Sequence, residues 1–264
     1  MQTSMKLLLT APPDQCRAAL RFGLPVAHVA YRVGGGPHLF RASIPVSVRG
    51  GLMVIDNTGF DGRGEAGPFC QEVLRECMAR GYDGILCDFE GHPLQVLAQA
   101  VRTLGELTKK RGWPLYVTEA YAPFSDSAIA LIPSALSGGS LQQRLQEAVE
   151  RFGAARVGLG GWEAGRVGQG ASLLPLPPST RPGGMPPHPG QELRQRLEER
   201  APSVFFSSEL CAHYFTYMSR QNGAHFVLFD DAGSIRKKLQ VARNLGISSA
   251  VLAYPRWMIS FPSC

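Results

Sequence analysis

The stretch YDGILCDFE, residues 82–90, decides how the rest of this 264-residue chain is interpreted. It is an apolar run typical of a buried strand, and it ends in two carboxylates, Asp88 and Glu90, separated by one residue. Because strand side chains alternate between two faces, Leu86, Asp88 and Glu90 are expected to point the same way, with the acids about 7 Å apart along the strand. Neighbouring carboxylates push each other's pKa values apart, so one of them can stay protonated near neutral pH and donate a proton to a leaving group.

Apolar runs alternate with amphipathic stretches on both sides of this strand. Strands are predicted at residues 6–10, 26–33, 51–56, 82–90, 114–119, 128–132, 156–162 and 249–254, with a β-excursion at 40–48. Helices are predicted at residues 14–21, 68–80 (ending at Gly81), 94–110, 141–152 and, after a cap at Asp230 or Asp231, up to Asn244. Strands that alternate with helices indicate parallel βαβ units, and eight units close an α/β barrel of the (β/α)8 or TIM type. An open doubly wound sheet is the alternative that this pattern leaves open.

In a parallel barrel, the end of the strand at 82–90 lies at the C-terminal rim, where active sites are built, and Cys87 and Phe89 would face the helices. Other residues that follow predicted strands are expected at the same rim: Asp56, Asn57, Glu119, Tyr121 and Trp162. Glu119 is expected either to bind a substrate hydroxyl or to pair with a nearby arginine. An aromatic residue at a rim either stacks on a ligand ring or packs half-buried.

The regular pattern breaks between the seventh and eighth predicted strands. We interpret residues 163–232 as an insertion into a single barrel domain that spans residues 1–264. Residues 164–189 are rich in glycine, proline and serine, so a long surface loop is expected there, either overhanging the site or serving as a mobile tether.

The rest of the insertion is expected to be ordered. Residues 191–200 are predicted to form a helix. The Asn222-Gly223 dipeptide between two apolar runs predicts an antiparallel β-hairpin over residues 214–229, which gives this subregion an α+β character.

Composition limits the classes of function. Hydrophobic residues make up 44% of the chain and charged residues 18%, an ordinary balance for a globular protein. The formal charge of +6 comes from Lys and Arg residues scattered over predicted helices, which favours solvated helix faces over a nucleic-acid site. No stretch approaches the roughly 18 apolar residues that span a bilayer. The apolar run at 6–10 is too short for a signal peptide, so synthesis in the cytoplasm without one is expected.

The cysteines indicate a reducing environment. The chain has six of them, Cys16, Cys70, Cys77, Cys87, Cys211 and Cys264. They form no CxxC pair and no spacing typical of zinc ligands, so we expect buried, reduced thiols and no metal site.

Two segments resemble glycoside hydrolase family 18. The family's fourth-strand signature is DGxDxDxE, and this chain has DGILCDFE at residues 83–90. The block from Tyr214 to Leu239, with its hairpin and following helix, is similar to the hairpin inserted after the seventh strand of that family and the helix before the eighth. The likeness is greatest to bacterial members of the spore cortex and germination type.

This resemblance implies a fold, a reaction and a substrate class. In the family, the glutamate is the general acid and base, and the substrate's own 2-acetamido group attacks the anomeric carbon. By resemblance, Glu90 would be the acid/base and Asp88 would orient the acetamido group. The substrate would be an N-acetylated glycan of peptidoglycan or chitin type, hydrolysed without a cofactor, and the protein would be spore-associated.

The chain departs from the family pattern at three places. Leu86 stands where the family has the middle aspartate of the signature. The sixth strand ends at Ile132-Pro133-Ser134-Ala135, with no tyrosine to hold the acetamido oxygen. The last strand is followed by Tyr254 and Trp257, either of which would replace the family's tryptophan floor beneath the sugar.

These observations leave three functions to compare. The first is a glycosidase that uses Glu90 and Asp88. Its substrate-binding residues would be Asp56, Glu119, Tyr121, Trp162, Tyr254 and Trp257. The second, favoured by the departures, is a barrel that has lost turnover and binds glycans or serves a structural role in sporulation. The third is an unrelated barrel enzyme in which Asp56, Asp88, Glu90 and Glu119 bind a divalent metal.

Overall fold

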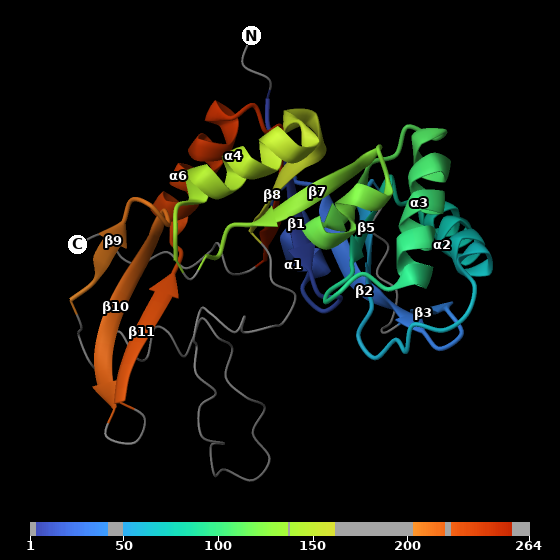
Figure 1. Ribbon diagram of the computed structural model, residues 1–264, viewed down its shortest axis with the longest axis horizontal. Helices are drawn as coiled ribbons and strands as arrows, with labels where there is room; N and C mark the ends of the chain where they lie inside the picture. The colour runs from blue at the N-terminus through green and yellow to red at the C-terminus, as the bar shows by residue number, and fades with distance from the viewer. Residues whose placement is uncertain (1–3, 42–49, 137, 162–202, 220–222, 255–264) are drawn as a thin grey trace.

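The central element is a closed barrel of eight parallel strands (Figure 1). The computed structural model describes residues 4–41, 50–136, 138–161, 203–219 and 223–254. The barrel strands are β1 (Lys6–Ala11), β2 (Val26–Gly34), β4 (Leu52–Asp56), β5 (Gly84–Asp88), β6 (Leu115–Thr118), β7 (Ala128–Pro133), β8 (Val157–Gly161) and β12 (Ser249–Ala253). Each pairs in parallel with the next, and β12 pairs with β1, so the predicted barrel is confirmed and the open sheet is excluded.

Helices cover the outside of this barrel (Figure 1). The helical elements are α1 (Cys16–Leu20), α2 (Ala66–Arg80), α3 (Gln95–Lys109), η1 (Glu119–Phe124), α4 (Leu141–Phe152), η2 (Ala154–Arg156) and α6 (Ala232–Asn244). The predicted α-helices within the described residues lie within two residues of these bounds. Helix α2 ends at Gly81, whose φ of +73° is the left-handed conformation that glycine adopts at low cost.

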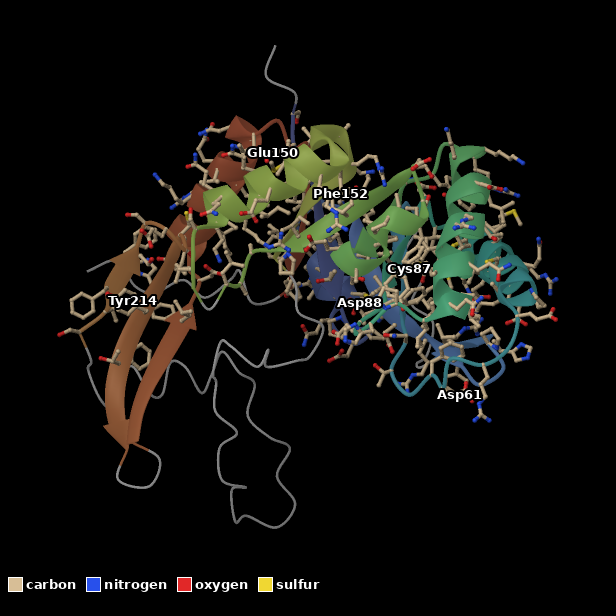
Figure 2. The ribbon with its side chains drawn as sticks, in the orientation of Figure 1. Asp61, Cys87, Asp88, Glu150, Phe152 and Tyr214 are labelled. Carbon is tan, nitrogen blue, oxygen red and sulfur yellow. The ribbon has the colours of Figure 1, made fainter. Side chains whose placement is uncertain are left out.

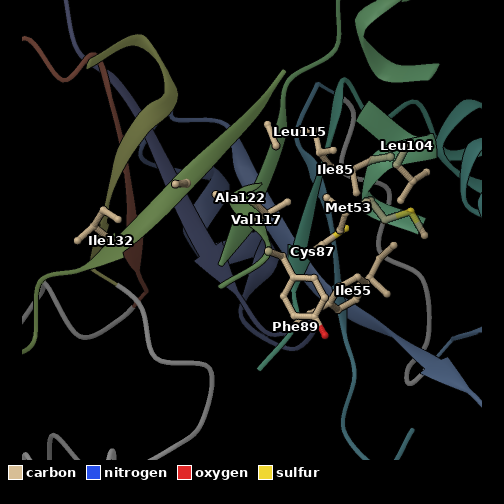
Figure 3. Close-up of a cluster of buried hydrophobic side chains, with 14 of the residues drawn as sticks. Met53, Ile55, Ile85, Cys87, Phe89, Leu104, Leu115, Val117, Ala122 and Ile132 are labelled. Atoms are coloured by element: carbon tan, nitrogen blue, oxygen red, sulfur yellow. The ribbon is translucent and has the colours of Figure 1, made fainter. Parts of the chain in front are cut away.

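The outward-facing side chains of the barrel strands form an apolar outer layer between the strands and the helices. Figure 3 shows Met53, Ile85, Cys87 and Phe89 in one buried cluster with Leu104 of α3. Each of these side chains is buried, and the outward positions predicted for Cys87 and Phe89 are confirmed.

The inward-facing side chains of the strands fill the interior of the barrel. A second buried cluster takes residues from most of the strands: Leu8, Ala27, Leu52, Val54, Leu86, Tyr116, Leu131 and Val251. Leu86 lies in register between Val54 of β4 and Tyr116 of β6 and is fully buried. On β8, Gly158 is the register partner of Leu131, and a Cβ at this position would come within 2.9 Å of the Leu131 side chain.

The predicted strands lie within two residues of the observed bounds, and two of the differences shape the rim. Strand β5 ends at Asp88 rather than Glu90, and β6 ends at Thr118 because Glu119 begins the 3-10 helix η1. Strand β3 (His38–Arg41) pairs antiparallel with β2 and begins before the predicted excursion at 40–48, most of which lies outside the described residues.

A separate small sheet follows β8 in the chain. It consists of β9 (Phe205–Ser207), β10 (Ala212–Ser219) and β11 (Gly223–Phe229), all antiparallel, and β10 and β11 form the predicted hairpin. Asp231 caps α6 by a capping box: its Oδ1 accepts from Ser234 N at 2.7 Å, while its own N donates to Ser234 Oγ at 2.8 Å. The loop at 164–189 and the helix at 191–200 lie outside the described residues, so the insertion bounds of 163–232 stay a prediction.

The cysteines of the described chain are buried and unpaired. These are Cys16, Cys70, Cys77, Cys87 and Cys211, whereas Cys264 lies outside the described residues. The expectation of buried thiols is confirmed for the described part of the chain, and burial raises the pKa of Cys16, Cys70 and Cys77 to about 12. Among the same residues, no helix has both the length and the apolarity needed to cross a bilayer.

Candidate active site

Two acids stand side by side at the C-terminal rim. Asp56 is the last residue of β4 and Asp88 is the last residue of β5, and the two are register partners. Both follow inward-facing residues, Val54 and Leu86 respectively, so both carboxylates belong to the inner face of the barrel. Asp88 is only 8% exposed and Asp56 is half-buried.

Asp56 also makes a local bond that fixes its side chain. Its Oδ1 accepts from Thr58 N at 2.8 Å, the two-residue pattern of an Asx turn. Figure 2 shows Asp88 at the lower side of the barrel, beside Cys87 and far across the view from Tyr214 on the small sheet. The geometry at this rim therefore gathers acids from two adjacent strands.

Glu90 lies two residues beyond the end of β5, and its backbone is held by a side chain. Asn57 Nδ2 donates to Glu90 O at 3.0 Å, and Glu90 N donates to Asn57 Oδ1 at 2.9 Å. On the other side, Thr118 Oγ1 donates to Phe89 O at 2.5 Å. Asn57 was expected at the rim, but neither its bonds nor the role of Thr118 was predicted. The sequence feature that could have indicated these bonds is a polar residue at the end of β4 and another at the end of β6.

Tyr121 lies in the outer layer and not in the barrel mouth. Its ring packs edge-on against Phe89 with ring centroids 5.4 Å apart, and its hydroxyl accepts from Leu94 N at 3.0 Å. The side chain is fully buried. Tyr121 therefore exposes no surface on which a sugar could stack. This residue was expected at the rim, because it follows a predicted strand.

Glu119 turns toward helix α4. Arg144 donates to its Oε2, and Arg151 Nη1 lies 3.9 Å from its Oε1. Glu119 was expected either to bind a substrate hydroxyl or to pair with an arginine, and in the structure it pairs with arginines.

Tyr254 follows β12 and continues its contact with β1. Its backbone N donates to Thr10 O at 2.9 Å, and its half-buried ring lies 5.8 Å from that of Phe22. Trp162 and Trp257 lie outside the described residues. At the end of β7, Ser134 is buried and its N donates to Gly160 O at 2.8 Å, which ties β7 to β8.

The hypothesis of a four-acid metal site is wrong for the described residues. Within them, no three or more His, Cys, Asp or Glu side chains gather as ligands for a metal ion. The physical reason at Glu119 is its ion pair with Arg144, which draws the carboxylate toward α4 and away from the rim acids.

Solved structures with the same fold include enzymes that act on glycans. No family model matches the sequence. The spore cortex-lytic enzyme SleL of Bacillus megaterium QM B1551 superposes with a TM-score of 0.64 at 14% identity, over 97% of this chain and 71% of that chain. A chitinase of Chromobacterium violaceum gives a TM-score of 0.67 at 14% identity, over 96% and 95%. The class V chitinase of Nicotiana tobaccum gives 0.59 at 11% identity, over 96% and 94%. The chain therefore has the barrel fold of chitinases and spore cortex-lytic enzymes, and its resemblance to glycoside hydrolase family 18 is confirmed at the level of the fold.

Proposed function

We propose that this protein hydrolyses glycosidic bonds in N-acetylated glycans, with Glu90 as the general acid and base. The observation that carries the proposal is the end of β5: the alternation that places Leu86 inside the barrel brings Asp88 to the rim on the same face. Glu90 follows two residues later, and its side chain is half-buried. The fold shared with glycan-degrading enzymes supports the same substrate class.

The chemistry proceeds in two steps. Glu90 donates a proton to the glycosidic oxygen as the bond from that oxygen to the anomeric carbon breaks, and the substrate's acetamido oxygen forms a new bond to that carbon. Water then gives a proton to Glu90 and attacks the anomeric carbon, which releases the acetamido group. Asp88 accepts a hydrogen bond from the acetamido nitrogen during both steps and stabilises the charge that develops there.

Asp56 takes over the part of the missing inner carboxylate in this proposal. Leu86 is buried between Val54 and Tyr116, so no acid stands beneath Asp88 on its own strand. The adjacent carboxylate comes from β4 instead. Among the remaining substrate-binding candidates, Trp162, Tyr254 and Trp257 stay proposals as sugar contacts, whereas the bonds made by Glu119 and Tyr121 favour supporting roles.

The test is hydrolysis of a fluorogenic chitobioside and of purified peptidoglycan by the wild type and Glu90→Gln. Turnover that is lost in Glu90→Gln supports the proposal, because the amide keeps the shape of the side chain but cannot deliver a proton. Equal turnover in both proteins would rule out Glu90 as the acid. Hydrolysis of peptidoglycan but not of the chitobioside would favour the cortex as substrate and an association with spores.

A second function is favoured by Leu86. The position that carries an acid in the family is here part of the apolar barrel interior. This observation supports a barrel that binds glycans without turnover. Binding of chito-oligosaccharides measured by calorimetry, in the absence of any hydrolysis by the wild type, would establish this alternative.

A further inference from the structure

The backbone of Phe89 and Glu90 keeps the hydrogen-bonding pattern of β5 after the strand has ended. In a parallel sheet, the N–H and C=O of one residue face the same neighbouring strand, and those of the next residue face the other. Ile85 N donates to Pro114 O at 3.0 Å, on the β6 side. Odd-numbered residues of this strand therefore face β6, and even-numbered residues face β4.

The two side-chain contacts follow this alternation. The carbonyl of Phe89, an odd position, bonds to Thr118 of β6, and both backbone groups of Glu90, an even position, bond to Asn57, which directly follows β4. An amide and a hydroxyl thus take the places of the backbone groups that the neighbouring strands no longer offer. Only one orientation of the Asn57 amide satisfies both of its bonds.

We propose that Asn57 and Thr118 are positioning residues for Glu90, an inference that rests on the proposed role of Glu90 as acid and base. Because they extend the strand by two residues, they also extend its side-chain alternation. Phe89 is fully buried in the outer layer, where its ring meets Tyr121. The next side chain, that of Glu90, is consequently directed to the inner face, above Leu86 and Asp88. Gly91 then turns the chain with a φ of +80°.

The chemistry of position 57 requires an amide. An alanine would remove both bonds to Glu90. An aspartate has the same shape and still accepts from Glu90 N, but its second oxygen faces the carbonyl of Glu90 and cannot donate to it. It would also add a negative charge between Asp56 and Glu90. Asn57→Ala and Asn57→Asp therefore test the same contact in different ways, and the second keeps the test decisive if the first does not fold.

Amide hydrogen exchange measures the contact without relying on activity. Asn57→Ala, Asn57→Asp and Thr118→Val should raise the exchange rate of the segment around Glu90 by roughly tenfold, while Leu86 inside the barrel stays protected. Thr118→Ser retains the hydroxyl and should exchange like the wild type. Asn244→Ala is a matched control, because Asn244 also forms a side-chain hydrogen bond, with Gln240 at 2.8 Å, on the exposed end of α6.

Kinetics measure what the positioning contributes to the reaction. A displacement of about 1 Å at a reacting group can cost on the order of 100-fold in rate, so we expect kcat to fall about 10- to 100-fold in Asn57→Ala and Asn57→Asp. KM should stay within about twofold, because the substrate contacts themselves are unchanged. Thr118→Ser should restore the kcat that Thr118→Val loses, which a loss of general stability would not predict.

The outcomes separate the inference from the proposed function. Unchanged exchange around Glu90 in both Asn57 variants, or a crystal structure of Asn57→Ala with Glu90 undisplaced, would overturn the positioning role. A fall in kcat matched by an equal rise in KM would overturn it as well. If the wild type has no turnover, the proposed function fails, and the exchange rates and the crystal structure still decide whether Asn57 and Thr118 fix Glu90.

Discussion

Asp56 and Asp88 are register partners at the last positions of two adjacent parallel strands, so their carboxylates leave the barrel at the same height and on the same inner face. Side chains directly abreast on neighbouring strands are separated by about one strand spacing, roughly 4.8 Å. The family 18 signature DGxDxDxE has both aspartates on one strand, whereas in this chain one aspartate ends each of two adjacent strands. The consequence is testable at each of the positions involved.

The first prediction concerns the charge of Asp56. Asp56→Asn keeps the side-chain oxygen that accepts from Thr58 N and removes only the negative charge. If this charge supports Asp88 during the reaction, turnover of the chitobioside should fall about tenfold or more. The measurement is kcat/KM over a range of pH.

The matched control for this prediction is Asp61→Asn. Asp61 is exposed, and its Oδ1 accepts from Arg63 N at 3.1 Å, which is the same two-residue turn outside the pair of register partners. Equal activities for Asp56→Asn, Asp61→Asn and the wild type would show that Asp56 has no part in the reaction.

The second prediction concerns the apolar interior around Leu86. Leu86→Asp restores the residue of the family signature, but it places a carboxylate between Val54 and Tyr116, at a position where the native side chain is fully buried. We expect the free energy of unfolding to fall by about 3 kcal/mol or more, because a buried carboxylate is costly and the leucine packing is lost. Urea denaturation followed by circular dichroism measures the change.

Leu86→Met is the control at this position. It conserves volume and apolar character, so its cost should stay below about 1.5 kcal/mol. Should Leu86→Asp prove as stable as Leu86→Met, the barrel interior would be more polar than the packing of Leu86 indicates.

The third prediction concerns His28 and acid. The ring is fully buried, its Nδ1 lies 2.7 Å from the Tyr82 hydroxyl, and burial lowers the pKa of His28 below the ordinary value of 6.5. In the unfolded chain, His28 therefore becomes protonated near pH 6.5, whereas in the folded protein it becomes protonated only at a lower pH. Stability should be complete above about pH 7 and fall as the pH drops through this window.

The measurement is the free energy of unfolding in urea at several pH values between 5 and 7.5, for the wild type and His28→Gln. Carboxylates also lose their contributions in acid, so the difference between the two slopes is the relevant quantity. A slope in His28→Gln as steep as that of the wild type would assign the acid sensitivity to other groups.

The fourth prediction concerns the thiols. Because burial raises the pKa of Cys16, Cys70 and Cys77 to about 12, and that of Cys87 and Cys211 above the usual range, these five side chains are protonated and shielded at neutral pH. In a Cys264→Ser variant, native protein should not react with a thiol-specific disulfide reagent over minutes, whereas protein in denaturant should release five equivalents. Fast labelling of the native variant would mean that one of the buried layers opens readily.

Much of the fold was determined by the sequence itself. Alternating apolar patterns predicted the barrel strands and the helices between them, because a period of two and a period near 3.6 are set by the backbone geometry of each element. The dipeptide Asn222-Gly223 predicted the hairpin of β10 and β11, and the outward positions of Cys87 and Phe89 followed from the alternation on β5. The spacing of Asp88 and Glu90, two positions apart, was likewise visible in the local sequence.

The tertiary structure decided which side chains meet at the rim. The register that sets Asp56 beside Asp88, and the bonds from Asn57 and Thr118 to the backbone of Glu90 and Phe89, join residues about 30 positions apart in the sequence. Glu119 and Tyr121 follow β6, yet their side chains turn to Arg144 and Leu94 because η1 begins there. A strand pattern fixes which face a side chain takes, but the partner on the next strand depends on barrel closure and register, which only the packed chain establishes.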